Sequence, residues 1–268
     1  MKRIAWNDLP GPLRSAIEAR TGPVIAARTA GAGENSPLAA IITTADGMVF
    51  AKGMPSGHRR VASQEHEAVV APLVQEISPA LLWHFDEAGW NVLGYEYVRG
   101  RHADYSPGSA DLDAMVRLIT ALGEIKVLDA GLFKRAEDRW RSYVEEPEGA
   151  GLLSGSTLIH SDWAPDNVLM SPGRAWLIDW AWPTLGAAWI DPACWVLRLM
   201  ASGGHTAREA ERQAARTRAF EAADPRHIDM FAAASLRLWT EIAQADGSAW
   251  TAAMARSARE WLRHRGCQ

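Results

Sequence analysis

The sequence has few cysteines and no long hydrophobic run, and each absence excludes a class of protein. Cys194 and Cys267 are the only cysteines in 268 residues, too few for a disulfide framework or a cysteine-based metal site. No stretch approaches the roughly 20 apolar residues that cross a bilayer. The charged N-terminus is not followed by the apolar segment of a secretory signal. We therefore expect a cytoplasmic protein without a membrane partner.

The sequence also lacks an excess of positive charge. Lysine and arginine total 28 against 32 acidic residues, and the net charge of -4 is not the basic signature of nucleic-acid-binding proteins. We therefore expect no nucleic-acid partner. Hydrophobic residues make up 48% and charged residues 22%, which is typical of a folded globular protein. The length suits one large domain or two lobes around a cleft.

The first hundred residues contain short β-rich runs separated by turn residues. Residues 38–44 and 48–52 are joined by Ala45-Asp46-Gly47, and an Asp-Gly pair between apolar runs is a strong signal for a hairpin. A helical pattern covers residues 61–75, and branched and aromatic residues at 90–98 predict a further strand. The N-terminal part is therefore expected to be an antiparallel sheet with one helix.

After Gly100 the pattern becomes helical. An amphipathic stripe with spacings of three and four residues predicts a helix, and its apolar members are Leu112, Met115, Leu118, Ile119, Leu122 and Ile125. Further helical patterns cover residues 133–144, 206–223, 227–245 and 248–264. The sequence therefore predicts an α+β fold with a sheet-and-helix lobe at 1–98 and a mainly helical lobe at 99–268.

Residues 157–179 carry a polar motif between apolar runs. His160, Asp162 and Asn167 form H-x-D-x-x-x-x-N, and Asp179 ends a later apolar run. In kinases, the aspartate of such a loop accepts the proton of the acceptor hydroxyl, and the asparagine and a later aspartate bind magnesium. Magnesium prefers oxygen ligands, which Asn167, Asp179 and nucleotide phosphates would supply. The alternative is a chance polar turn between two strands.

Lys52 is the second candidate, because it ends the apolar run at residues 48–52 in a chain with few lysines. This is the context of the kinase strand lysine, which holds the α- and β-phosphates and pairs with a glutamate on the following helix. The helical pattern at 61–75 offers Glu65 and Glu67, either of which could instead be a solvated helix carboxylate. The order of lysine, glutamate, Asp162, Asn167 and Asp179 along the chain is the order that a kinase requires.

On these residues the sequence resembles the aminoglycoside-phosphotransferase family, whose fold is that of the protein kinases. Trp180 and Ala181 replace the phenylalanine and glycine of the protein-kinase D-F-G motif. Asp191 follows Asp179 too closely for a long activation segment, so a protein substrate is not expected. The resemblance implies a two-lobed kinase-like fold, magnesium with ATP or GTP as cofactors, and Asp162 as the catalytic base.

The resemblance also implies roles for residues outside the motif. The family's R-E-A run aligns with His66-Glu67-Ala68, which favours Glu67 over Glu65 as the partner of Lys52. A Ser-Pro pair in a loop of related kinases assigns the Ser36 hydroxyl to the phosphates, although a plain surface turn at residues 29–37 is the alternative.

A hinge and a structural tether complete what the resemblance implies. The hinge falls at residues 94–100, where main-chain groups of Glu96 and Val98 would meet the adenine edge. In this fold the histidine of the loop, here His160, packs to support it. The later aspartate, Asp191, would accept hydrogen bonds from the loop backbone.

The acceptor is less well specified. Acidic residues at 137–138 and at 145, 146 and 148 would suit a cationic small molecule, although a solvated helix face with Arg135, Arg139 and Arg141 is the common alternative. Tryptophans 163, 180, 182 and 189 could provide stacking surfaces or core.

Phosphoryl transfer from ATP to a hydroxyl of a small molecule is the primary hypothesis. A catalytically silent kinase-like protein that binds a nucleotide or metabolite is the alternative. A metal-dependent hydrolase would need further ligands near His160 and Asp162, at a spacing that the sequence lacks.

Overall fold

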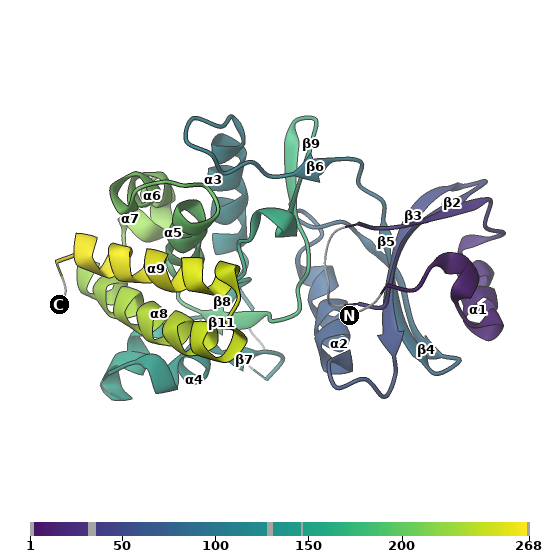
Figure 1. Ribbon diagram of the computed structural model, residues 1–268, viewed down its shortest axis with the longest axis horizontal. Coiled ribbons are helices and arrows are strands. Elements are labelled where there is room, and N and C mark those ends of the chain that lie inside the picture. Colours follow the sequence, from purple (N-terminus) through teal and green to yellow (C-terminus); the bar gives the residue numbers. More distant parts are fainter. Residues whose placement is uncertain (1–2, 32–35, 128–130, 146, 267–268) are drawn as a thin grey trace. The chain divides into compact units, whose positions relative to one another are not determined.

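The computed structural model describes residues 3–31, 36–127, 131–145 and 147–266, and it divides into two compact units (Figure 1). The first comprises Met1–Arg101 and Trp176–Trp182, and the second comprises His102–Ala175 and Pro183–Gln268. Residues 176–182 join the first unit because Leu177 N–H donates to Ile77 O and Trp180 Nε1 donates to Ser78 Oγ, each at 2.8 Å. This division differs from the predicted lobe boundary after Val98, which left residues 176–182 with the C-terminal lobe.

The first unit contains a five-stranded sheet in the order β1-β2-β3-β5-β4. The strands are β1 Ala26–Thr29, β2 Leu38–Thr44, β3 Gly47–Pro55, β4 Leu81–Glu87 and β5 Trp90–Glu96. Each neighbouring pair is antiparallel. The predicted hairpin is confirmed as β2 and β3, with Gly47 at φ 135°, a conformation that favours glycine. The predicted strand at 90–98 is β5.

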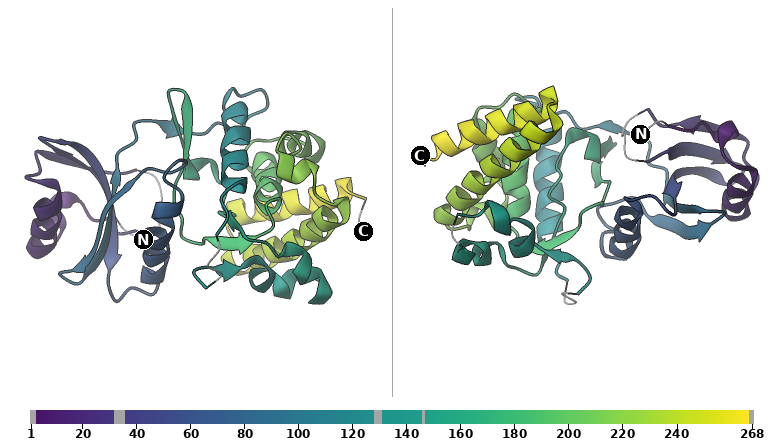
Figure 2. Two further views of the ribbon diagram at one scale, coloured as in Figure 1. Left: turned by 180° about the vertical axis from the view of Figure 1, so that it is seen from behind. Right: turned by 60° about the horizontal axis from the view of Figure 1, so that its bottom comes forward.

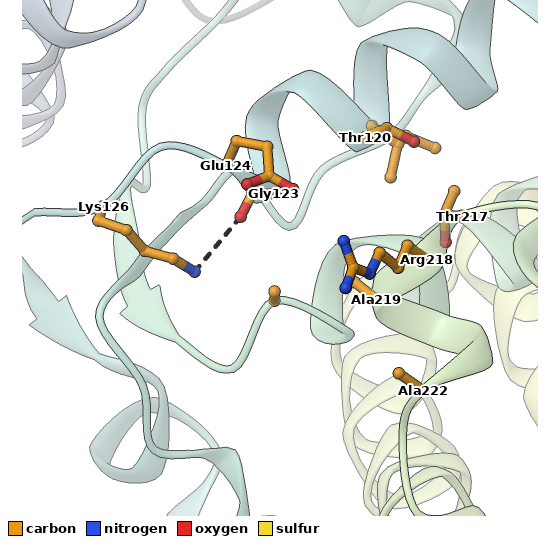
Figure 3. Close-up of a pocket in the computed structure, with 10 residues that line it drawn as sticks. Thr120, Gly123, Glu124, Lys126, Thr217, Arg218, Ala219 and Ala222 are labelled. Atoms are coloured by element: carbon orange, nitrogen blue, oxygen red, sulfur yellow. Dashed lines mark hydrogen bonds between the residues drawn. The ribbon is translucent and has the colours of Figure 1, made fainter.

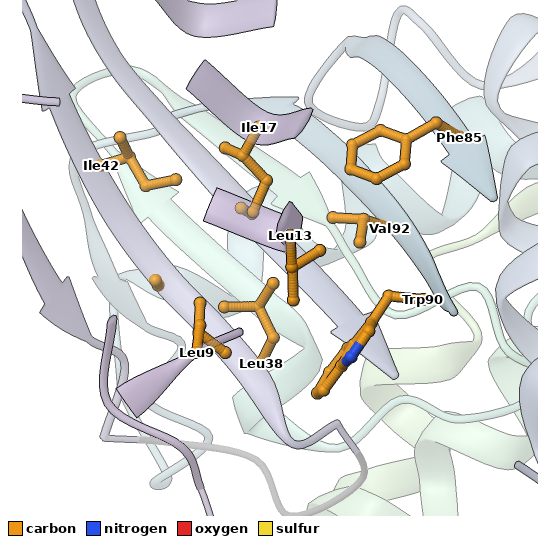
Figure 4. Close-up of a cluster of buried hydrophobic side chains, with 10 residues drawn as sticks. Leu9, Leu13, Ile17, Leu38, Ile42, Phe85, Trp90 and Val92 are labelled. Carbon is orange, nitrogen blue, oxygen red and sulfur yellow. The ribbon is translucent and has the colours of Figure 1, made fainter. Parts of the chain in front are cut away.

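Two helices lie on opposite faces of this sheet (Figures 1 and 2). Helix α1, Gly11–Thr21, covers one face, and α2, Val61–Val70, covers the other and continues into the 3-10 turn η2, Ala71–Leu73. The first face holds the core of the unit (Figure 4), which contains Leu9, Leu13, Ile17, Leu38, Ile42, Phe85, Trp90 and Val92. Full burial of one such aliphatic side chain contributes about 1.5–3 kcal/mol. The short turn η1, Trp6–Asp8, leads into α1.

The second unit is mainly helical. Its helices are α3 Asp111–Gly123, α4 Ala136–Arg139, α5 Ile190–Ala201, α6 Ala207–Ala214, α7 Arg218–Glu221, α8 Pro225–Asp246 and α9 Ala249–His264. Helices α8 and α9 lie side by side (Figures 1 and 2). Gly247, at φ 68°, ends α8 in the left-handed conformation, and Ser248 caps α9 by accepting a hydrogen bond from Thr251 N. Helix α5 packs against α6 and α9.

Short strands connect these helices. They are β6 Arg101–His102, β7 Lys134–Arg135, β8 Thr157–Ile159, β9 Val168–Ser171, β10 Arg174–Leu177 and β11 Thr184–Gly186. Two three-stranded sheets result, in the orders β10-β9-β6 and β7-β11-β8. The 3-10 segments η3 Arg141–Tyr143, η4 Pro147–Leu153 and η5 Pro165–Asn167 complete the secondary structure. The loop that carries the polar motif lies between β8 and β9.

The prediction of one helix over residues 133–144 is wrong. Lys134 and Arg135 are extended because they pair in parallel with Thr184 and Leu185 of β11, and only α4 and η3 follow. The pattern at 206–223 likewise divides into α6 and α7, because Thr217 adopts an extended conformation. The predicted helices at 112–125, 227–245 and 248–264 are confirmed as α3, α8 and α9. Within the described ranges, no helix has the length and apolar character to cross a bilayer.

Candidate active site

A cluster of three charged side chains gathers around Lys52 in the first unit. Lys52 Nζ, from β3, donates to Glu67 Oε1 at 2.6 Å and to Asp179 Oδ1 at 2.7 Å. Glu67 comes from α2, and Asp179 comes from the segment that returns to this unit. The Lys52 side chain is 13% exposed and that of Glu67 only 4%. Three distant parts of the sequence therefore meet in one largely buried ion-pair network.

The electrostatics of this cluster follow from burial and from the contact of opposite charges. Burial disfavours the charge on Lys52, but Asp179 and Glu67 outweigh it and raise the pKa of the ammonium group. Burial also raises the pKa of Glu67; the Lys52 charge opposes this shift, and the Asp179 charge adds to it. Both carboxylates thus contact the ammonium group of Lys52, which remains charged.

Glu67, not Glu65, is the helix carboxylate that contacts Lys52. Glu65 is exposed, two positions away on α2, whereas Glu67 is buried. Tyr95 also donates its hydroxyl to Glu67 Oε2 at 3.2 Å, so both carboxylate oxygens of Glu67 accept hydrogen bonds. Sequence reasoning did not identify Tyr95. Its register on β5, opposite Phe50 of β3, brings it near the cluster, and no local motif marks it.

Asp179 and Ser161 both have strained main-chain conformations. Their φ angles are 67° and 66°, in the left-handed region that residues other than glycine seldom adopt. Such a residue costs on the order of 1–3 kcal/mol, which the surrounding contacts must offset. At Asp179, the hydrogen bond from Trp180 to Ser78 fixes the following residue. One strained residue, Ser161, thus directly precedes the predicted site residue Asp162, and the other, Asp179, is itself a predicted site residue.

The loop after β8 in the second unit is tethered by Asp191 from α5. Asp191 Oδ2 accepts from His160 N at 3.0 Å, and Oδ1 accepts from Ser161 N at 2.7 Å. Burial raises the pKa of Asp191, while these two N–H donors favour its ionised form. Asp162 N–H, in turn, donates to Nδ1 of the His160 ring at 3.2 Å. The structural roles predicted for His160 and Asp191 are confirmed.

Hydrogen bonds hold the main chain of Asp162 at its N–H and at its carbonyl, and they hold its side chain at one oxygen. Its carbonyl accepts from Asn167 Nδ2 at 3.0 Å, and its N–H faces His160 Nδ1. Its Oδ1 accepts from Arg198 Nη2 at 2.5 Å. The Asp162 side chain is 46% exposed, whereas that of Arg198 is 6% exposed. The carboxylate therefore meets solvent from a fixed position.

Asn167 and Asp179 have the chemistry of magnesium ligands. Because Asn167 Nδ2 donates to Asp162 O, its Oδ1 is directed away from that carbonyl as an oxygen donor. Asp179 presents a carboxylate that is 30% exposed. Hard cations such as magnesium take oxygen donors, often one or two from protein together with phosphate and water. In the part of the chain that the structure describes, no group of three or more His, Cys, Asp or Glu could hold a metal.

The remaining predicted site residues differ in how they are placed. Ser36 is 3% exposed, and its buried Oγ has no partner within the described residues, while its carbonyl accepts from Arg3 Nη1 at 2.7 Å. Residues 32–35, which precede it, lie outside the described residues. Glu96 N–H donates to Ala80 O at 2.9 Å, so this N–H is already used within the protein. Val98 follows the end of β5.

The candidate acceptor residues are mostly paired or packed. Glu137 pairs with Arg135 at 2.5 Å and Asp138 with Arg141 at 2.9 Å, while Glu145 lies 3.7 Å from Arg237. Residue 146 and the side chain of residue 148 lie outside the described part of the chain. Of the four tryptophans considered, Trp163, Trp180 and Trp189 are buried, and Trp182 is 64% exposed.

A shallow pocket of about 300 Å³ lies elsewhere in the second unit (Figure 3). It is bordered by the end of α3 and by α7, and its polar lining includes Thr120, Glu124, Lys126, Thr217 and Arg218. Lys126 Nζ donates to Gly123 O at 3.4 Å across its edge. None of the predicted site residues lines it.

No protein-family model and no curated protein matches the sequence. Solved structures do match. The choline kinase LicA from Streptococcus pneumoniae has a TM-score of 0.65 at 16% identity, covering 94% of this chain and 98% of that chain. A thermostable mutant of the aminoglycoside phosphotransferase APH(4)-Ia has a TM-score of 0.62 at 14% identity, covering 91% and 98%.

A putative fructosamine-3-kinase from Haemophilus somnus 129PT has a TM-score of 0.60 at 10% identity, covering 96% of this chain and 98% of that chain. LicA has also been solved with AMP, and a mutant of APH(4)-Ia with ADP and hygromycin B. The neighbours are small-molecule kinases, and this chain has their fold. The predicted resemblance and the predicted α+β fold are thereby confirmed.

Proposed function

We propose that this protein transfers the γ-phosphoryl group of ATP or GTP to a hydroxyl of a small molecule. The observation that carries the proposal is Lys52 Nζ in contact with both Glu67 and Asp179. In kinases, the strand lysine pairs with a helix glutamate and the later aspartate binds the metal next to the phosphates, so both contacts support a nucleotide site. The neighbours solved with AMP and with ADP support nucleotide binding.

In this proposal the N-terminal lobe, residues 1–98, binds the nucleotide. The raised pKa of Lys52 keeps its ammonium group positively charged. Phosphate oxygens of the nucleotide would replace some of its contacts with the carboxylates. The Ser36 hydroxyl is buried without a protein partner in the described residues, and a phosphate oxygen would satisfy it. The carbonyl of Glu96 and the main chain of Val98 would meet the adenine edge.

The C-terminal lobe, residues 99–268, supplies the catalytic base. Asp162 would accept the proton of the acceptor hydroxyl as that oxygen attacks the γ-phosphorus and the bond to the nucleotide diphosphate breaks. A half-exposed carboxylate on a doubly tethered loop suits this role, because the base must reach a diffusing substrate without losing its orientation. Magnesium, which Asn167 and Asp179 would hold, neutralises charge on the phosphates when bound.

The acceptor is proposed to be a small alcohol, and alcohols that carry a cationic group are included in the proposal. The neighbours are named as a choline kinase, an aminoglycoside phosphotransferase and a fructosamine kinase, and one is a complex with hygromycin B. Acidic side chains at residues 137, 138 and 145 would favour a cation, although each has an arginine partner. Choline, hygromycin B and a fructosamine therefore form the first panel to test.

The test is phosphate transfer from γ-labelled ATP or GTP, with magnesium, to that panel. We expect D162A to abolish transfer while nucleotide affinity, measured by titration, stays within about twofold of the wild type. The matched control is D166N, which changes an exposed carboxylate in the same loop. It should transfer phosphate like the wild type.

Two outcomes would contradict the proposal in different ways. Full transfer by D162A would refute Asp162 as the base. Nucleotide binding by the wild type, without transfer to any acceptor or hydrolysis of the nucleotide, would favour the catalytically silent nucleotide-binding alternative.

A further inference from the structure

Arg198 of α5 is a buried cation that pairs with the carboxylate of Asp162. Its guanidinium donates from Nη2 to Asp162 Oδ1 at 2.5 Å, and its side chain is 6% exposed. In the part of the chain that the structure describes, Asp162 is the only carboxylate that forms an ion pair with it. Burial of a guanidinium is costly unless it is paired and hydrogen-bonded. The position of Arg198 is therefore tied to the position of the proposed base.

Two tryptophans border the guanidinium and restrict its orientation. Its central carbon lies 4.7 Å from the ring centroid of Trp250 and 5.7 Å from that of Trp239. The two rings contact each other edge to face, with centroids 5.3 Å apart. Nη1 lies 3.9 Å from Met254 Sδ. A planar guanidinium on aromatic faces has few alternative orientations, so α8 and α9 together aim Arg198.

The contacts of Asp162 leave one polar atom for a ligand. Its N–H faces His160, its carbonyl accepts from Asn167, and Oδ1 accepts from Arg198. Oδ2 has no protein partner within the described residues, and the side chain is 46% exposed. Of the two partners only the arginine is buried, so the carboxylate of Asp162 is accessible to a ligand.

The catalytic loop cannot supply such a cation from its own sequence. Residues 158–170 contain neither lysine nor arginine. The nearest positive charge to the base therefore has to come from another element, and α5 provides it. The same helix carries Asp191, which tethers the loop backbone. Helix α5 thus fixes both the main chain of the loop, through Asp191, and the side chain of Asp162, through Arg198.

We propose that Arg198 is a positioning residue that holds Oδ1 of Asp162 and so presents Oδ2 to the acceptor hydroxyl. This inference rests on the proposed function. The acceptor proton passes to Oδ2 while the acceptor oxygen bonds to the γ-phosphorus and the bond to the nucleotide diphosphate breaks. The Arg198 contact with Oδ1 persists throughout and keeps the carboxylate from rotating away.

The test compares R198M and R198K with the wild type in the transfer assay. R198M should lower kcat by about 10²-fold, since a catalytic group displaced by about 1 Å loses roughly that factor. Nucleotide affinity should stay within about twofold, because Arg198 acts only on the base. R198K keeps a cation that can reach Oδ1, and we expect it to recover roughly tenfold of the loss. W250A should lower kcat less than R198M, and W250F, which keeps a ring, less than W250A.

The matched control is R216M, which removes an exposed Arg–Asp pair of the same unit, 2.6 Å from Asp113. It should leave kcat unchanged. If Arg198 had a purely structural role, R198M and R198K would both have a lower melting temperature, and lysine would not rescue kcat. That result would overturn the inference. So would a wild-type kcat in R198M while D162A is inactive. Full activity of D162A would instead refute the proposed function, and the positioning role with it.

Discussion

The side chains around Lys52 and the loop around Asp162 are held in place by different kinds of contact. Around Lys52, two carboxylates from different parts of the chain pair with one largely buried ammonium group. Around Asp162, tethers hold the main chain, and a single arginine holds one side-chain oxygen. The first arrangement keeps a cation charged in a buried site, as binding of anionic phosphates requires. The second leaves an atom open, as proton transfer requires.

Both regions nevertheless share a strained residue. Ser161 and Asp179 have nearly the same left-handed φ, one before the proposed base and one at the proposed metal ligand. In each case a neighbouring hydrogen bond restrains the chain. Ser161 N–H donates to Asp191, and Trp180, which follows Asp179, donates to Ser78. Function and strain coincide at both places, as they often do where a side chain must point in one direction.

Among the variants that test this difference between the two regions, K52M should have the largest effect. Without the ammonium group, kcat/KM for the nucleotide should fall roughly 10²- to 10³-fold, as when one preorganised donor to a transition state is removed. Unlike D162A, this variant should also lose nucleotide affinity in a direct titration. K134M, at an exposed lysine, is the control. If K52M bound the nucleotide like the wild type, the cluster would have no part in binding.

A smaller effect is expected from D191N, which tests the loop. The amide can accept only one of the two hydrogen bonds, so one buried N–H loses its partner and the free energy of unfolding should fall by about 1–3 kcal/mol. Denaturation in urea measures this loss, with D138N, at an exposed ion pair, as the control. If D191N were as stable as the wild type, the hydrogen bonds between Asp191 and the loop would not contribute to the stability of the native state.

The smallest effect, and the one that sharpens the contrast, is the pH dependence of the Lys52 cluster. Burial raises the pKa of Glu67 above its usual 4.5, so acidification neutralises Glu67 and weakens its pair with Lys52 before an ordinary glutamate would titrate. KM for the nucleotide should therefore rise as pH falls through that raised value. E67Q should show a KM about tenfold higher, equivalent to roughly 1.4 kcal/mol, without this acid limb.

E65Q is the control for that measurement, because Glu65 is exposed on the same helix. Its pH profile of KM should match that of the wild type. An acid limb that persisted in E67Q and disappeared in E65Q would assign the lysine partner to the wrong glutamate.

Elements with strong local signals could be predicted from the sequence. The Asp-Gly turn specified the β2–β3 hairpin, and one-sided apolar stripes specified α3, α8 and α9. Helix α5 was missed because nearly all of its residues are buried, and a short apolar run such as 195–200 is equally typical of a buried strand. The helix predicted at residues 133–144 was longer than α4, because the pairing of Lys134 and Arg135 with β11 competes with the local helical pattern.

The site was predictable as a set of residues but not as a set of contacts. The motif and its order along the chain identified Lys52, Asp162, Asn167 and Asp179, whereas the meeting of Lys52 with Asp179 depends on the return of residues 176–182 to the first unit. Arg198 was missed, although a signal exists. It is the one charge in the apolar run 195–200, and a charge at such a position must be paired.

The return of residues 176–182 has a consequence for biogenesis. The first unit is discontinuous in sequence, so a fragment that ends at Arg101 contains Lys52 and Glu67 but lacks Asp179. During synthesis, the ammonium group of Lys52 acquires its second counter-charge only after much of the second unit has been translated. Domains usually fold in order as they are made, but this unit cannot complete its charged centre until the chain reaches Asp179.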